Sequence, residues 1–318
     1  MQDAENQSFN EPRAPSNLGL GSANSRPTRL GPFNARWRAG IRFFAFLILV
    51  RLVLIPLAFW AVQPFFPGDK AHWGDFAEAI VLACVLIGTW IMAKVERRSV
   101  LSYGLRDRRA FRHLATGALT GFLSLTLMLL GLFATHHLEF RLSRSSIAVL
   151  VTTAFTNVLA FLIVAVFEET AFRGYALYTL RQAIGFWPAA IAMSLFFAFA
   201  HRGNPGEANA GLMAVFVFGL ILAFSVWRTG TLLWAIGFHF MWDYSESFLY
   251  GVPDSGFVSP EHLLSAKFLG PAWITGGSVG PEGSWFIFLI LATVALVIHF
   301  RYPQRRFRVL QSEGQGLG

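Results

Sequence analysis

Residues 146–167 read SIAVLVTTAFTNVLAFLIVAVF and carry no charged side chain. A run of about 20 apolar residues is long enough to cross the hydrocarbon core of a bilayer as a helix. Directly after it the chain reads EETAFR, at residues 168–173, so an apolar helix ends in three ionisable groups. This stretch predicts a transmembrane helix that delivers a polar site to the membrane.

The chain on both sides of this stretch has the same character. Of the 318 residues, 54% are hydrophobic and only 14% are charged, against about 25% charged in an average soluble domain. This composition excludes a soluble globular protein and a wholly disordered one. We predict an all-α fold, a polytopic membrane helix bundle of about eight transmembrane helices. The apolar stretches are 41–63, 76–93, 114–134, 146–167, 184–200, 208–227, 230–249 and 284–300.

The domain organisation follows from where the apolar stretches begin and end. Residues 1–38 are rich in Asn, Ser, Pro, Gly and Arg, and we expect a disordered cytoplasmic tail there. Residues 39–300 form the transmembrane bundle, and residues 301–318 form a basic cytoplasmic C-terminal tail. Cys84 is the single cysteine, which excludes an intramolecular disulfide and a cysteine-cluster metal site.

The net charge of +8 has two explanations, nucleic-acid binding or an uneven distribution of charge across a membrane. Most Lys and Arg residues fall in the two tails and in the loop 94–112, which share one side in an eight-span topology. The positive-inside rule places that side in the cytoplasm, so the basic charge requires no nucleic-acid partner, and the lipid bilayer is the expected surroundings. The opposite side holds Lys70, Arg141, Arg144, Arg202 and Lys267.

Ionisable side chains within apolar stretches are costly and indicate function by default. Glu169 and Arg173 are four residues apart on a helix, so they share a face and can pair. Glu168 points about 100° away from that pair and is left available, as a general base requires. His201 ends a second apolar stretch.

A third apolar stretch carries His239 and Asp243, which also share a helix face. Glu168 and His201 lie at similar distances along the chain before and after the expected turn at Gly185, so they can lie at similar depth. A carboxylate base, an imidazole and further hydrogen-bond donors are the groups that water activation in hydrolysis needs.

These three motifs, E-E-x-x-x-R, F-x-x-x-H and H-x-x-x-N/D in this order, resemble those of one membrane protein family. It is the CPBP family of CAAX protease and bacteriocin-processing proteins, also called ABI, which includes the type II CAAX prenyl endopeptidases. The resemblance covers about residues 95–250. It implies that Glu168 is the general base and that it activates a water held with His201. It further implies an oxyanion-hole or metal role for His239 and Asp243, with Glu169 and Arg173 as supporting residues.

Asp243 departs from the family pattern, because the eukaryotic members carry Asn at this position. Asn always offers N–H donors, whereas Asp donates only when it is protonated. Asp243 therefore either holds a proton, orients His239 or binds a metal. A divalent metal such as Zn²⁺, held by Glu168, His201, His239 and Asp243, stays open beside a metal-free site.

The function that this pattern favours is an intramembrane endopeptidase acting on a peptide or membrane-protein substrate. A non-proteolytic scaffold or immunity protein of the same fold is an alternative, and so is a proton-coupled transporter that uses the same residues as a relay. We expect an integral protein of the bacterial inner membrane with both termini in the cytoplasm.

The long loop of residues 251–284 is rich in Gly and Pro but also carries apolar side chains. Loops of this length are usually functional or disordered. We expect this loop to fold back over the bundle as a cap that limits access of water and substrate. The alternative is an interfacial hairpin with Trp273 anchored among the lipid headgroups.

Overall fold

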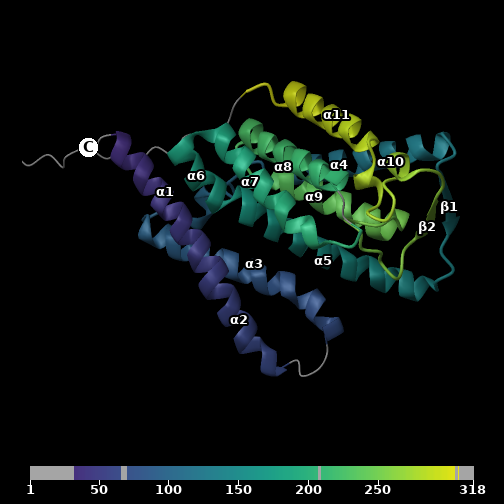
Figure 1. The fold of residues 1–318 in the computed structure, drawn as a ribbon, viewed down its shortest axis with the longest axis horizontal. Coiled ribbons are helices and arrows are strands. Elements are labelled where there is room, and N and C mark those ends of the chain that lie inside the picture. Colours follow the sequence, from purple (N-terminus) through teal and green to yellow (C-terminus); the bar gives the residue numbers. More distant parts are fainter. Residues whose placement is uncertain (1–31, 66–69, 207–208, 305–306, 308–318) are drawn as a thin grey trace, which may run out of the picture.

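The computed structural model of the chain describes residues 32–65, 70–206, 209–304 and 307. Helices dominate these residues and pack into one bundle (Figure 1), which confirms the predicted membrane helix bundle. The helices are α1 (Pro32–Ile48), α2 (Ile55–Val62), α3 (Lys70–Val95), α4 (Ala110–Ala134), α5 (Ile147–Arg173), α6 (Tyr175–Ile184), α7 (Phe186–Ala200), α8 (Asn209–Thr229), α9 (Leu233–Tyr244), α10 (Ala272–Thr275) and α11 (Phe286–Arg301).

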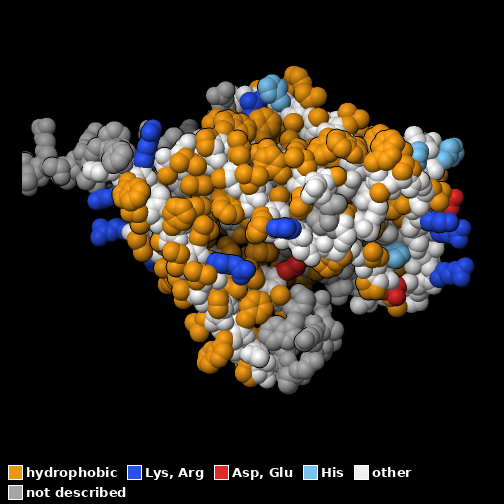
Figure 2. Space-filling view, viewed as in Figure 1, with side chains coloured by type: hydrophobic (Ala, Val, Ile, Leu, Met, Phe, Trp, Pro, Cys, Tyr) orange, Lys and Arg blue, Asp and Glu red, His pale blue; other side chains and the backbone are white. Residues whose placement is uncertain are grey.

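Five helical stretches among the described residues are long and apolar enough to cross a membrane. The predicted count of eight is not reached by this measure, because α7, α9 and α11 have only 15, 12 and 16 residues. Hydrophobic side chains cover most of the face shown in Figure 2, as expected where lipid is the solvent. The five stretches are Asn34–Phe65, Phe76–Val95, Ala110–Ala134, Ile147–Ile184 and Asn209–Thr229.

The first helix begins earlier than the sequence analysis predicted. Helix α1 starts at Pro32, inside the range 1–38 that was expected to be a disordered tail. Proline at the first helical position is favourable, because its fixed φ suits a helix and that N–H has no partner within the helix. Residues 1–31 of the tail, and most of the tail 301–318, lie outside the described residues.

Close packing between α4 and α9 fixes the helix that carries two of the candidate residues. Gly117 and Gly121 lie one turn apart on α4, and a Cβ on either would come within 2.3 Å of the Trp234 or Phe238 carbonyl oxygen. Gly237 is equally close to the Leu114 carbonyl. Small residues at this spacing let two backbones approach, as in many membrane helix pairs. Helix α9 is therefore held directly against α4.

The helix that follows the EETAFR motif is buried rather than exposed. Helix α5 ends at Arg173, and α6 starts again at Tyr175 after a break at Gly174. Tyr175 to Arg181 are all buried, and α6 packs against α1 and α7. Gly185, with φ of 90°, then turns the chain into α7, as expected of a glycine at this turn. The chain thus folds back from α5 to α7, which brings the ends of both helices together.

One short sheet departs from the all-α prediction. Strand β1 (Leu138–Leu142) pairs antiparallel with β2 (Leu264–Phe268), with Phe140 opposite Ala266. Strand β2 belongs to the loop 251–284, and the pairing ties this loop to the end of α4 (Figure 1). Val252 and Val279, near the two ends of the loop, are buried. The loop therefore folds back onto the bundle, as the sequence analysis predicted, while its effect on access stays a prediction.

Candidate active site

A cavity of about 610 Å³ lies between α5, α7, α8 and α9. Its walls include all four predicted catalytic residues, Glu168, His201, His239 and Asp243. A cavity of this size is typical of sites that bind ligands. The structure therefore brings together residues that are separated by up to 75 positions in the chain.

The ion pair predicted within the EETAFR motif is present and buried. Arg173 donates from Nη1 to Glu169 Oε1 over 2.8 Å, and the two residues are 1% and 0% exposed. The Arg173 guanidinium also stacks on the Phe197 ring, 4.4 Å from its centroid, a favourable cation–π contact. Gly219 of α8 lies so close that a Cβ there would be 3.0 Å from Arg173 Nη2. The pair thus ties α5 to α7 and α8.

His239 links this ion pair to the cavity, a contact that the sequence analysis did not predict. Its Nδ1 lies 3.0 Å from Oε1 of Glu169. Its Nε2 lies 3.4 Å from Oε2 of Glu168 and 3.4 Å from Oδ2 of Asp243. Ionised carboxylates only accept hydrogen bonds. Nδ1 therefore faces Glu169, and Nε2 faces both Glu168 and Asp243.

His201 presents one nitrogen to the cavity. Its Nδ1 lies 2.9 Å from the Phe197 carbonyl oxygen, one turn earlier in the chain. A carbonyl only accepts, so Nδ1 donates the ring proton, and Nε2 of the neutral imidazole keeps its lone pair. Phe197 also packs edge-on against the His201 ring, at 4.6 Å between centroids. This backbone contact therefore fixes the tautomer that can accept a hydrogen bond from water.

Glu168 is the most accessible carboxylate of the EETAFR motif. Its side chain is 16% exposed, whereas that of Glu169 is fully buried. The expected division of roles therefore has a geometric basis, because Arg173 pairs with Glu169 and not with Glu168. Glu168 lies in the wall of the cavity that also contains His201.

The four candidate metal ligands do not form the compact set that one ion requires. Among the described residues, they are not part of any group of three whose ligand atoms all lie within 4.8 Å of one another. Zinc ligands at 2.0–2.3 Å from the ion lie closer together than this. His239 also already contacts a carboxylate from each ring nitrogen. This arrangement does not fit a zinc site.

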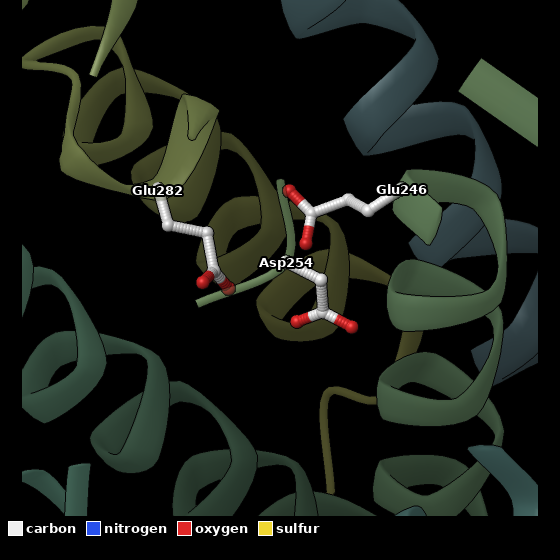
Figure 3. A group of neighbouring side chains, drawn as sticks. All are labelled: Glu246, Asp254 and Glu282. Carbon is white, nitrogen blue, oxygen red and sulfur yellow. The ribbon is translucent and has the colours of Figure 1, made fainter. Parts of the chain in front are cut away.

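Three further acids adjoin the site and were missed in the sequence analysis. Asp254 and Glu282, both in the loop 251–284, line the same cavity, and Glu246 lies beside them (Figure 3). Burial, followed by the charge of Glu282, raises the pKa of Asp254 well above its usual range. The available signal was the presence of acidic side chains in a loop rich in Gly and Pro.

Comparison with protein families gives one match that includes the site. Residues 150–245 match the family model described as type II CAAX prenyl endopeptidase Rce1-like. Searches of curated proteins and of solved structures found no match. The family match confirms, for this part of the chain, the resemblance predicted from the motifs. The match covers less than a third of this membrane protein, and the matching part, which is similar to the CAAX protease family, is the one that carries Glu168, His201, His239 and Asp243.

Proposed function

We propose that this protein is an intramembrane endopeptidase that hydrolyses a peptide bond with a water activated by Glu168. The observation that carries the proposal is the separation of the two neighbouring glutamates. Glu169 is neutralised by Arg173, while Glu168 faces a cavity that also contains the free nitrogen of His201. A carboxylate base and an acceptor for the second water proton then lie in the same cavity.

In the proposed reaction, water lies between Glu168 and Nε2 of His201. Glu168 takes one proton as the water oxygen attacks the carbonyl carbon of the substrate, and His201 accepts a hydrogen bond from the other. The carbonyl oxygen gains negative charge in this step. Glu168 then gives its proton to the leaving nitrogen as the carbon–nitrogen bond breaks, so the water is fully accounted for.

The oxyanion needs hydrogen-bond donors, and in this proposal Nε2 of His239 and the carboxyl of Asp243, each carrying a proton, supply them. A donor aimed at the developing charge in a site that excludes bulk water contributes about 3 kcal/mol to transition-state stabilisation. Glu169 keeps the other ring nitrogen of His239 occupied, over 3.0 Å, so the imidazole is held with Nε2 toward the cavity. Glu169 and Arg173 are therefore positioning residues in this proposal.

The surroundings support a peptide or membrane-protein substrate. The cavity is lined by Phe161, Phe167, Phe172 and Phe218 beside the polar groups, so it suits an apolar segment that enters from lipid. We place the protein in a bacterial inner membrane with both termini in the cytoplasm, on the strength of the basic tails. Protease protection of tags at each terminus tests this orientation, and a tag cleaved only from outside contradicts it.

The experiment compares new protein termini in membranes of cells that make the wild type, Glu168→Gln, His201→Ala or Glu139→Gln. Glu139→Gln is the matched control, because Glu139 is exposed on β1, away from the cavity. We expect the wild type and the control to produce the same new termini, and Glu168→Gln and His201→Ala to produce none while accumulating normally.

Two results would overturn the proposal at different levels. If Glu168→Gln produces the same termini as the wild type, Glu168 is not the base. If no terminus depends on the wild-type protein, the protein is not a protease in these cells, and the scaffold, immunity or transporter alternative replaces it.

A further inference from the structure

Three carboxylates converge beside the cavity. One oxygen from each of Glu246, Asp254 and Glu282 lies within 4.8 Å of the others, and within the described part of the chain this is the one such group of three potential metal ligands. Figure 3 shows Glu246 extending toward the two loop acids from the helical turn that follows α9. The cluster joins chain segments that are 36 residues apart at most, yet it forms only because the loop folds back.

Of the three acids, Glu246 gives the strongest indication of a bound ligand. It lies on the π-helical turn Ser245–Tyr250, is 0% exposed, and neither of its carboxylate oxygens has a hydrogen-bond partner in the described residues. Burying a carboxylate without a partner is costly, and two further acids beside it add repulsion. The position is therefore favourable only when a positive charge or protons are present.

Asp254 and Glu282 are held in place by hydrogen bonds from the loop and from the turn after α9. The Ser255 N–H and hydroxyl both donate to Oε2 of Glu282, over 3.1 and 2.8 Å, and the Ser247 hydroxyl donates to Oδ2 of Asp254. Gly280 makes the approach possible, because a Cβ there would lie 2.1 Å from the Pro253 carbonyl oxygen. Hydrogen bonds that orient carboxylates in this way are typical of ligands in metal sites.

We propose that Glu246, Asp254 and Glu282 bind one hard divalent cation, with Ca²⁺ as the best fit. Carboxylate oxygens are the ligands that Ca²⁺, Mg²⁺ and Mn²⁺ prefer. Ligands of Ca²⁺ lie 2.3–2.6 Å from the ion, so two of them on opposite sides lie about 5 Å apart. Three oxygens that lie within 4.8 Å of one another are close enough to bind one ion at these distances, and water from the cavity can complete the coordination shell.

Such an ion joins the loop 251–284 to the end of α9, since Asp254 and Glu282 come from the loop and Glu246 follows the helix. The loop also contacts the segment after His201, where a Cβ on Gly256 would lie 2.0 Å from the Pro205 carbonyl oxygen. A cation bound at this site would thus hold the loop, which forms part of the cavity wall, against the end of α9. It is distinct from Glu168 and His201, and it holds whether or not the chain is a protease.

The test measures binding directly, without any cleavage assay. Purified full-length protein in detergent is freed of metal with a chelator and titrated with Mn²⁺, and free Mn²⁺ is followed by electron paramagnetic resonance with Ca²⁺ as competitor. We expect about one ion per chain, with a Kd of about 10⁻⁵ to 10⁻³ M. Glu246→Gln, Asp254→Asn and Glu282→Gln should each weaken binding at least about tenfold, whereas Glu139→Gln, the matched control, and Glu168→Gln should not.

A second measurement uses only the wild type, so it does not depend on the folding of a variant. Ca²⁺ should raise the thermal unfolding temperature in a saturable manner, and chelator should reverse the shift. Absence of both binding and shift overturns the proposal and means that protons, or a cationic group of a substrate, neutralise the cluster. Binding that is lost in Glu168→Gln but kept in the three cluster variants also overturns it, because the ion then belongs to the catalytic residues.

Discussion

Nδ1 of His239 lies 3.0 Å from the same Glu169 oxygen that accepts a hydrogen bond from Arg173. One carboxylate oxygen thus neutralises a buried guanidinium and orients an imidazole on a helix 70 residues further along the chain. Two adjacent residues of the EETAFR motif therefore have different roles. Glu169 sets the arrangement of the site, and Glu168 is left for chemistry.

This relationship predicts that Glu169 and Arg173 affect both stability and activity. Glu169→Gln leaves the Arg173 charge buried without its partner, and breaking a buried pair costs about 3–5 kcal/mol. The protein should accumulate poorly and unfold at a lower temperature in detergent. The double variant Glu169→Gln/Arg173→Met removes both charges and should recover most of the stability.

Recovery of activity is expected to be incomplete in that double variant, because His239 still lacks the carboxylate beside Nδ1. Thermal unfolding and cleavage measured on the same preparations separate the two effects. If stability and cleavage recover together and completely, Glu169 has no positioning role.

Asp243 offers a test of the oxyanion assignment. Asp243→Asn supplies an N–H donor at every pH and should retain cleavage within about tenfold of the wild type, since one hydrogen-bond donor replaces another. Asp243→Ala removes the donor and should lower kcat about 10²–10³-fold. Equal, severe loss in both variants would mean that the negative charge of Asp243 is needed, for example to hold His239.

The contact between α4 and α9 predicts a sharp difference between two glycines of one helix. A Cβ at Gly121 would lie 2.3 Å from the Phe238 carbonyl oxygen, next to His239, whereas a Cβ at Gly131 meets nothing within 4 Å. Gly121→Ala should destabilise the protein by about 1–3 kcal/mol through overpacking and should reduce cleavage by displacing His239. Gly131→Ala, the matched control, should be neutral or slightly stabilising, and equal unfolding temperatures for the two variants would contradict the packing argument.

A pH dependence is expected at the start of α4. Burial alone raises the pKa of the Asp107 carboxyl, but hydrogen bonds from His113 and the Arg109 N–H, with the His113 charge, outweigh burial and lower it. A group whose pKa is lowered by folding stabilises the folded state above its ordinary pKa of about 3.9. That contribution is lost as the pH falls through the lower value in the folded state.

Unfolding in detergent should therefore show an acid-dependent loss of stability near and below pH 4 in the wild type. The loss should be smaller in Asp107→Asn, which cannot ionise. The exposed acid variant Glu139→Gln should keep the wild-type profile, and an unchanged profile in Asp107→Asn would show that this pair contributes nothing.

The membrane-spanning stretches and the four residues of the candidate site were within reach of sequence analysis for one physical reason. Ionisable groups such as Glu168 and His201 stand out in apolar runs, because the membrane tolerates few of them. The lengths of the later helices were not predictable in the same way. The π-helical turn Ser245–Tyr250, which continues α9, ends where Gly251, with φ of 57°, turns the chain back, and that turn depends on packing between distant segments.

The sequence analysis did not predict the cluster of Glu246, Asp254 and Glu282, for a related reason. No helical or strand period fixes the position of a residue in a long loop, so nothing local predicts that Asp254 and Glu282 meet. Their meeting depends on a backbone hydrogen bond from Gly256 to Val279 and on the close approach of Gly280 to Pro253. The contact between Glu169 and His239 escaped likewise, because pairing rules within one helix say nothing about a partner on another.

The glycines of α4 and α9 also limit how the molecule can open. With no side chain between their backbones at Gly117, Gly121 and Gly237, these two helices cannot rotate or slide independently and so move as one rigid body. In the proposed function, movement that admits a substrate is therefore expected at other helices of the cavity wall, such as α5, which supplies Asn157.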